Sequence, residues 1–199
     1  EAVVRAQALG DRLHAAVARV PLGGSLMRLG DLAAARAELQ QAVEGLVAVG
    51  DTLTLPEAWL HRGDVEAASG RPDEARACYA ESRALYAAGG QPTLGLVGQA
   101  RGALVLAERG DVASALDEVE PVLAHLGGAD AADPMAASLP LRWSCAQVLA
   151  AAGDPRPVGE LDAVRALVSD QAARIEDDSR REHFLRSHWV ARAVMASAA

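Results

Sequence analysis

Glycine recurs every 20 residues through the first half of the chain, in two interleaved series that each have a spacing of forty. The series are Gly10, Gly50, Gly90 and Gly30, Gly70, Gly110. Glycine adopts the left-handed backbone that ends a helix, and the aspartate that often follows it suits a helix N-cap. Each 20-residue unit is therefore predicted to be one helix and a tight turn, and each 40-residue unit a helical hairpin. A fixed period of this kind is typical of a solenoid.

The second helix of each hairpin carries an apolar stripe at helical spacing. The stripe begins at Leu32 in the first hairpin and recurs forty residues later at Pro72 and again at Val112. A fourth copy begins at Leu161, displaced by segments rich in Gly, Asp and Pro that are typical of loops. Four copies in one register predict four hairpins.

Composition supports an all-α fold. Apolar residues make up 51% of the chain, aromatic residues only 3%, and alanine, the best helix former, is abundant. No stretch keeps the alternation of a strand bounded by hairpin turns. The net charge of -8 argues against direct nucleic-acid binding, which requires a basic face. No apolar run reaches transmembrane length, so no membrane association and a cytoplasmic location are expected. Cys78 and Cys145 fit buried thiols.

The second hairpin resembles the tetratricopeptide (TPR) repeat. In that family an aromatic and a small residue on the first helix face an alanine and an aromatic on the second, as do Trp59, Gly63, Ala75 and Tyr79 here. The resemblance implies a right-handed α-α superhelix that binds protein or peptide partners in its concave groove. The period of forty exceeds the usual 34 of the family, and HEAT-like repeats remain the structural alternative.

The predicted organisation is one domain of four hairpins with a capping helix. Residues 1–10 are interpreted as the end of a truncated earlier repeat, so the parent protein is expected to extend N-terminally. The repeats are 11–50, 51–90, 91–130 and 131–176, and 177–199 form the capping helix. The expected helices are 1–9, 11–29, 31–49, 54–69, 72–88, 92–109, 111–126, 135–152, 160–175 and 179–196. For the last helix, a surface role in binding a partner or a membrane is the alternative to capping.

Residues 172–185 are similar to the end of TPR regions in large actinobacterial regulators. Those regulators include LuxR-type and SARP-type transcription factors and proteins linked to NTPase or cyclase domains. The relatives often continue with a Val-Pro…Arg segment, whereas Ser187-His188-Trp189 follows here. The similarity implies a signalling or transcriptional parent protein and leaves its type open.

A search for catalytic motifs finds none. A phosphate-binding loop needs a lysine, which the chain lacks. His183 and His188 are five residues apart, so they point in different directions on a helix and do not form a metal-binding pair. Neither a catalytic site, a cofactor nor a metal is predicted, and the chain is not expected to be an enzyme.

The TPR resemblance places the binding surface on the first helices of the hairpins. The positions expected to face the groove include the following residues: Arg28, Glu57, Leu60, Asp64, Leu104, Glu108, Trp143 and Gln147. Trp143 is either a contact anchor or a core filler. The leading hypothesis is a non-catalytic interaction or sensing module of a larger bacterial regulator. The alternative is a small-molecule effector site formed by Arg142, Trp143 and Gln147. The oligomeric state is left open.

Overall fold

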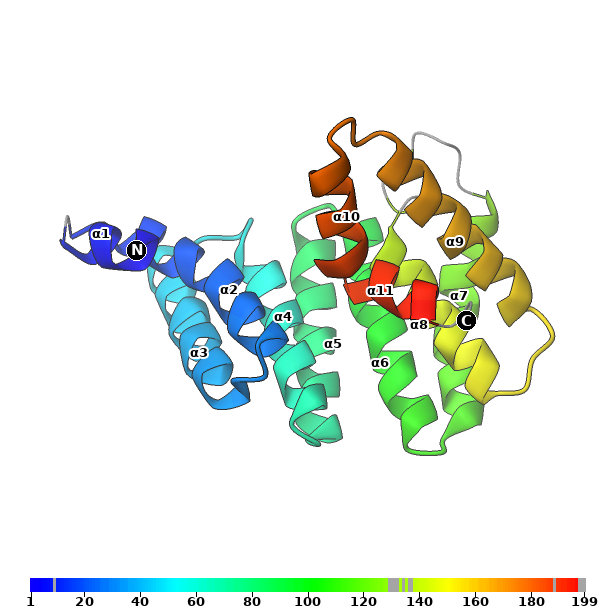
Figure 1. Cartoon of the computed structure of the whole chain (residues 1–199). Coiled ribbons are helices and arrows are strands. Elements are labelled where there is room, and N and C mark those ends of the chain that lie inside the picture. Colours follow the sequence, from blue (N-terminus) through cyan, green and yellow to red (C-terminus); the bar gives the residue numbers. More distant parts are fainter. Residues whose placement is uncertain (9, 129–132, 134, 136–137, 188, 197–199) are drawn as a thin grey trace. The chain divides into compact units, whose positions relative to one another are not determined.

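The computed structural model describes residues 1–199 except 9, 129–132, 134, 136–137, 188 and 197–199. In the described part of the chain every regular element is a helix (Figure 1). The elements are α1 (Ala2–Ala8), α2 (Arg12–Arg28), α3 (Leu32–Val49), α4 (Leu55–Ala68), α5 (Pro72–Ala88), the 3₁₀ turn η1 (Pro92–Gly95), α6 (Leu96–Glu108), α7 (Val112–Gly128), α8 (Leu139–Ala151), α9 (Pro157–Ala173), α10 (Asp178–Ser187) and α11 (Trp189–Ala196).

The periodic glycines end the helices as the sequence predicts. All six have a positive φ, between 69° and 86°, which a side chain would disfavour. Asp11 and Asp31 then cap the next helix by accepting a hydrogen bond from a backbone N–H three residues ahead. Asp51 makes the same bond to the N–H of Thr54, but α4 begins only at Leu55. Asp51 therefore stabilises the turn before the helix.

Most helices agree with the predicted ranges to within two residues, but α8 begins at Leu139 and not at 135, and α9 begins at Pro157 and not at 160. Residues 9 and 136–137 of the predicted helices lie outside the described residues. The expected helix 92–109 begins as the 3₁₀ turn η1 and becomes α-helical at Leu96. The expected helix 179–196 corresponds to α10 and α11, and residue 188 between them lies outside the described residues. The two parts differ in character, since α10 is rich in charged residues and α11 is mostly apolar. The apolar side of α11 packs against α8 and α9.

The chain forms two compact units, Glu1–Val105 and Leu106–Ala199, with the division inside α6. The predicted single domain and the predicted repeat boundaries stay predictions.

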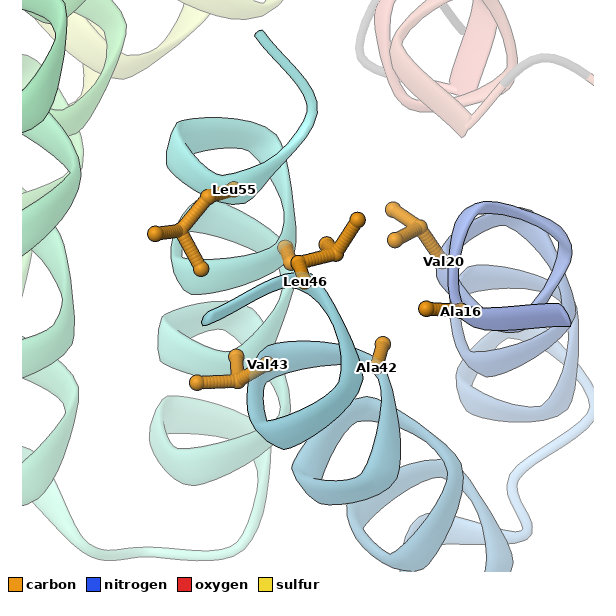
Figure 2. Packing of buried hydrophobic residues seen from close by; sticks show 7 residues of the cluster. Ala16, Val20, Ala42, Val43, Leu46 and Leu55 are labelled. Atoms are coloured by element: carbon orange, nitrogen blue, oxygen red, sulfur yellow. The ribbon is translucent and has the colours of Figure 1, made fainter. Parts of the chain in front are cut away.

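The core of the first unit lies where α3 packs between α2 and α4. Figure 2 shows Leu46 of α3 between Val20 of α2 and Leu55 of α4, with Ala16, Ala42 and Val43 beside them. Small residues allow these helices to approach closely. Of the stripe predicted on α3, Ala42, Val43 and Leu46 belong to this core, and Ala35 and Leu39 are buried in a second cluster with Val65 of α4.

The core of the second unit joins α8, α9 and α11. Its buried residues are Leu139, Val164, Val168, Val190, Ala191 and Val194. Arg181 of α10 fastens the helix to the end of α9: its Nε donates to the carbonyl oxygens of Ala172 at 3.1 Å and Ile175 at 3.0 Å. The C-terminal helices thus pack on the apolar side of the α8–α9 hairpin, and their role as the cap of a repeat array stays a prediction.

Candidate functional site

A hollow of about 470 Å³ opens between the N-terminal ends of the neighbouring first helices α2 and α4. Most of its lining is apolar, and a carboxylate and an imidazole add polar groups. The lining residues are Ala2, His14, Val17, Ala18, Val20, Pro21, Thr54 and Glu57. Residues 14, 17, 18 and 21 share one side of α2 because they follow helical spacing. A hollow with an apolar lining and few polar groups suits an apolar side chain of a ligand.

A charged network continues this surface along α4. His61 lies between two carboxylates of its own helix: its Nε2 is 3.6 Å from Glu57 Oε1, and its Nδ1 is 3.5 Å from Asp64 Oδ2. Asp64 also accepts hydrogen bonds from the hydroxyl of Tyr79, at 3.0 Å, and from the guanidinium of Arg101. The side chains of Asp64 and Arg101 are only 15% and 14% exposed, so this part of the surface is held rigidly.

The network shifts the pKa of its members. Burial lowers the pKa of His61, but the carboxylates of Asp64 and Glu57 outweigh it and raise the pKa to about 9. His61 is therefore a cation at neutral pH. Burial raises the pKa of Asp64, while the opposing Arg101 and His61 bring it below its usual value. Interaction with His61 also lowers the pKa of Glu57. Both carboxylates are ionised at neutral pH.

Arg28 reaches the same surface from α2. A Cβ built on Gly24 would lie 3.7 Å from Nη1 of Arg28 and 3.8 Å from Cε1 of His61, so both side chains lie beside Gly24. The hollow and the charged side chains of Arg28, Glu57, His61, Asp64 and Arg101 form one surface, which we call the first-helix face. The structure thus brings together three of the predicted residues, Arg28, Glu57 and Asp64.

The other predicted residues of α4 and α6 have different surroundings. Leu60 is half-buried and packs against the cluster of Ala75, Tyr79 and Val105. Leu104 is half-buried, and Glu108 near the end of α6 is exposed. The role of these residues in binding stays a prediction.

Trp143 and Gln147 lie on α8, in the second unit. Trp143 is half-buried and packs against the core that α8 shares with α9 and α11, so it contributes to the stability of this unit. Gln147 is half-buried. Arg142 donates a hydrogen bond of 2.9 Å to Glu160, so its charge already has a partner. The effector site proposed for these three residues stays a prediction.

His61 and Arg101, which organise the network, were not among the predicted site residues. The repeat contained the signal, because the two positions are forty residues apart and occupy the same place on successive first helices. The ion pairs that these residues form between hairpins were not predicted.

Within the described residues, no group of three or more His, Cys, Asp or Glu side chains is placed to hold a metal ion. Among the helices that the structure describes, none combines the length and the apolar character needed to cross a membrane.

Comparison with known families relates part of the chain to the tetratricopeptide repeat. Residues 13–88 match the model of this family, and the match spans the hairpins α2–α3 and α4–α5. No curated protein matches the sequence significantly.

Solved structures with the same fold include two crystal structures of a putative kinesin light chain from Podosopora anserina, described as having nearly identical TPR-like repeats. One, a variant with a Gln-to-Met substitution, is 17% identical, with a TM-score of 0.57 over 85% of this chain and 92% of that chain. The other is also 17% identical, with a TM-score of 0.55 over 88% and 94%. The likeness concerns the fold: this chain is a helical protein with TPR-like repeats.

Proposed function

We propose that the chain is a protein-binding module whose first-helix face holds a peptide segment of a partner. The hollow between α2 and α4 carries the proposal, because it offers an apolar recess beside ionised groups at fixed positions. Tetratricopeptide repeats generally mediate protein–protein interaction, which supports this use of the surface. A preformed surface binds a peptide with little ordering cost of its own.

The chemistry of the face suits a segment with both apolar and charged side chains. An apolar side chain enters the hollow beside Val17 and Pro21, while Glu57 and Arg28 provide one charge of each sign. His61 and Arg101 act as positioning residues, since each is held by carboxylates of α4.

Selection from a displayed peptide library, followed by calorimetry, tests this function. Pro21→Arg and Glu57→Arg both change exposed residues that line the hollow, and each is expected to weaken binding of a selected peptide at least about tenfold. Glu81→Arg is the matched control, because Glu81 is an exposed glutamate on the second helix α5, and it should leave affinity unchanged. If the library yields no binder, or if all three variants bind alike, the proposed function is wrong.

We also propose that this module belongs to a larger cytoplasmic bacterial regulator of signalling or transcription. The similarity of residues 172–185 to actinobacterial regulators supports this proposal. The free, buried thiols of Cys78 and Cys145 fit a reducing compartment. Capture of a DNA-binding or nucleotide-dependent partner domain by the chain, lost in Glu57→Arg, would support the role. Binding restricted to unrelated proteins would argue against it.

A further inference from the structure

Three arginines converge on one buried glutamate where α3, α4 and the start of α5 meet. The side chain of Glu66 is only 4% exposed. Arg36 of α3 donates to it through Nε at 3.4 Å and through Nη2 at 3.2 Å. Arg71, in the turn before α5, donates to the same carboxylate, and Nε of Arg62 lies 3.9 Å from Oε1. We call Arg36, Arg62, Arg71 and Glu66 the arginine cluster.

The cluster has more charge and more donors than one carboxylate satisfies. Three guanidinium groups and one carboxylate leave a formal charge of +2 in a chain whose net charge is -8. Nε of Arg62 and Nε of Arg71 are buried and have no hydrogen-bond partner within the described residues. Buried N–H groups of this kind favour an additional acceptor.

The three arginine side chains are held in place and remain partly exposed. Arg36, Arg62 and Arg71 keep 34%, 25% and 37% of their side-chain surface exposed. Arg62 is also held over the ring of Trp59, 5.0 Å from its centroid. The nearest acids of α5, Asp73 and Glu74, are exposed, so water and salt screen their charge.

The second hairpin carries this cluster in place of ordinary repeat residues. Glu66 occupies the position held by Leu26 and Leu106 in the neighbouring repeats. Arg71 occupies the position of Asp31, which caps α3, and α5 correspondingly has no side-chain cap. In this hairpin, Glu66 replaces an apolar leucine and Arg71 replaces a capping aspartate. Departures of this kind from local rules concentrate at functional sites.

We propose that the arginine cluster binds a phosphate monoester or inorganic phosphate. A guanidinium matches two oxygens of a phosphate group at once, and the two negative charges of the dianion equal the charge of the cluster. Glu66 is a positioning residue that holds the three guanidinium groups together against their mutual repulsion. The site is separate from the first-helix face and does not depend on the proposed function.

Thermal unfolding and arginine NMR of the full chain test the site, with inorganic phosphate as the probe and sodium chloride at the same ionic strength as the reference. Phosphate is expected to raise the melting temperature saturably. The Nε–H signals of Arg62 and Arg71 should shift along the same binding curve. Arg62→Gln should weaken the apparent affinity about tenfold, which corresponds to losing one charged contact. Arg174→Gln, at an exposed arginine paired with Asp170, is the matched control and should respond as the wild type does.

Glu66→Gln separates anion binding from a purely structural role of the cluster. The variant removes the internal carboxylate, so phosphate should raise its melting temperature more than that of the wild type. Should Arg62→Gln fold poorly, Arg36→Gln provides the same comparison at a more exposed side chain.

A phosphoserine peptide and its unphosphorylated form identify the source of the group. Tighter binding of the phosphopeptide than of inorganic phosphate indicates a phosphorylated partner, and equal affinity indicates a free phosphate compound; both support the site. The proposal is overturned if phosphate acts no more strongly than chloride on the wild type and on Glu66→Gln, or if the phosphate response is unchanged in Arg62→Gln.

Discussion

The ring of Tyr79 lies directly against the backbone of Gly63. A Cβ built on Gly63 would be 2.4 Å from Cε1 of Tyr79, closer than any real contact of such atoms. Gly23 and Leu39, each forty residues earlier, repeat the relationship, with 2.5 Å between the added Cβ and Cγ of Leu39. In both hairpins, the glycine on the first helix leaves the space that the large side chain on the second helix fills.

Gly63→Ala is expected to destabilise the chain by about 2 kcal/mol, because overpacking against Tyr79 outweighs the better helix propensity of alanine. Urea unfolding followed by circular dichroism measures the change. Gly24→Ala is the matched control on α2, since its Cβ would meet its neighbours at 3.7 Å or more. It should be neutral or stabilise by up to about 1 kcal/mol. Equal effects of the two substitutions would show that propensity, and not packing, dominates.

Tyr79→Phe removes the 3.0 Å hydrogen bond to Asp64 and keeps the ring against Gly63. The loss of a hydrogen bond to a charged group predicts destabilisation by about 1–2 kcal/mol. The same unfolding experiment measures it, and Tyr86→Phe provides a comparison at a half-buried tyrosine later on the same helix. A change within error for Tyr79→Phe would mean that Arg101 and His61 satisfy Asp64 without the hydroxyl.

The raised pKa of His61 predicts stability that declines in alkaline solution. The folded pKa is about 9 and the usual value is 6.5, so the protonated ring favours the folded state. This contribution, on the order of 3 kcal/mol, is complete below about pH 6.5 and is lost as pH rises through 9. Asp64, Glu57 and Arg101 keep their charges over this pH range. Within this network, the change in stability therefore comes from the deprotonation of His61.

His61→Gln isolates this effect. The stability difference between wild type and variant should be largest near pH 6 and should shrink steadily toward pH 10. Titration of the ring by NMR gives the folded pKa independently. A difference that is flat across this range, or a ring that titrates near 6.5, would contradict the ion-pair geometry of His61.

The repeated backbone features were predictable because they depend on local chemistry. The left-handed turns at Gly30 and Gly70 follow from a property of glycine itself, and the buried stripe of α3 follows from helical spacing. The close packing of Gly63 on the second helix of its hairpin was predicted in kind, but the side chain that fills the space is Tyr79.

Interactions between hairpins were not predictable in the same way. Arg101 reaches Asp64 from 37 residues away, and Arg36 reaches Glu66 from 30 residues away. Such ion pairs depend on which side chains the packed helices bring together, and the residue spacing within one helix does not predict them.

Arg181→Ala is expected to loosen the C-terminal helices. The Arg181 guanidinium donates to the carbonyl oxygens of Ala172, in the last turn of α9, and of Ile175, just beyond the end of that helix. Removing these bonds should cost about 2 kcal/mol and speed hydrogen exchange in α10 and α11 while leaving exchange in α2–α5 unchanged. Arg186→Ala is the control, because Arg186 is 78% exposed and pairs with Glu182 on its own helix, an interaction worth about 0.5 kcal/mol or less. Hydrogen exchange measured by mass spectrometry tests this prediction. Equal protection of α10 and α11 in both variants would mean that the apolar contacts of α11 alone hold these helices in place.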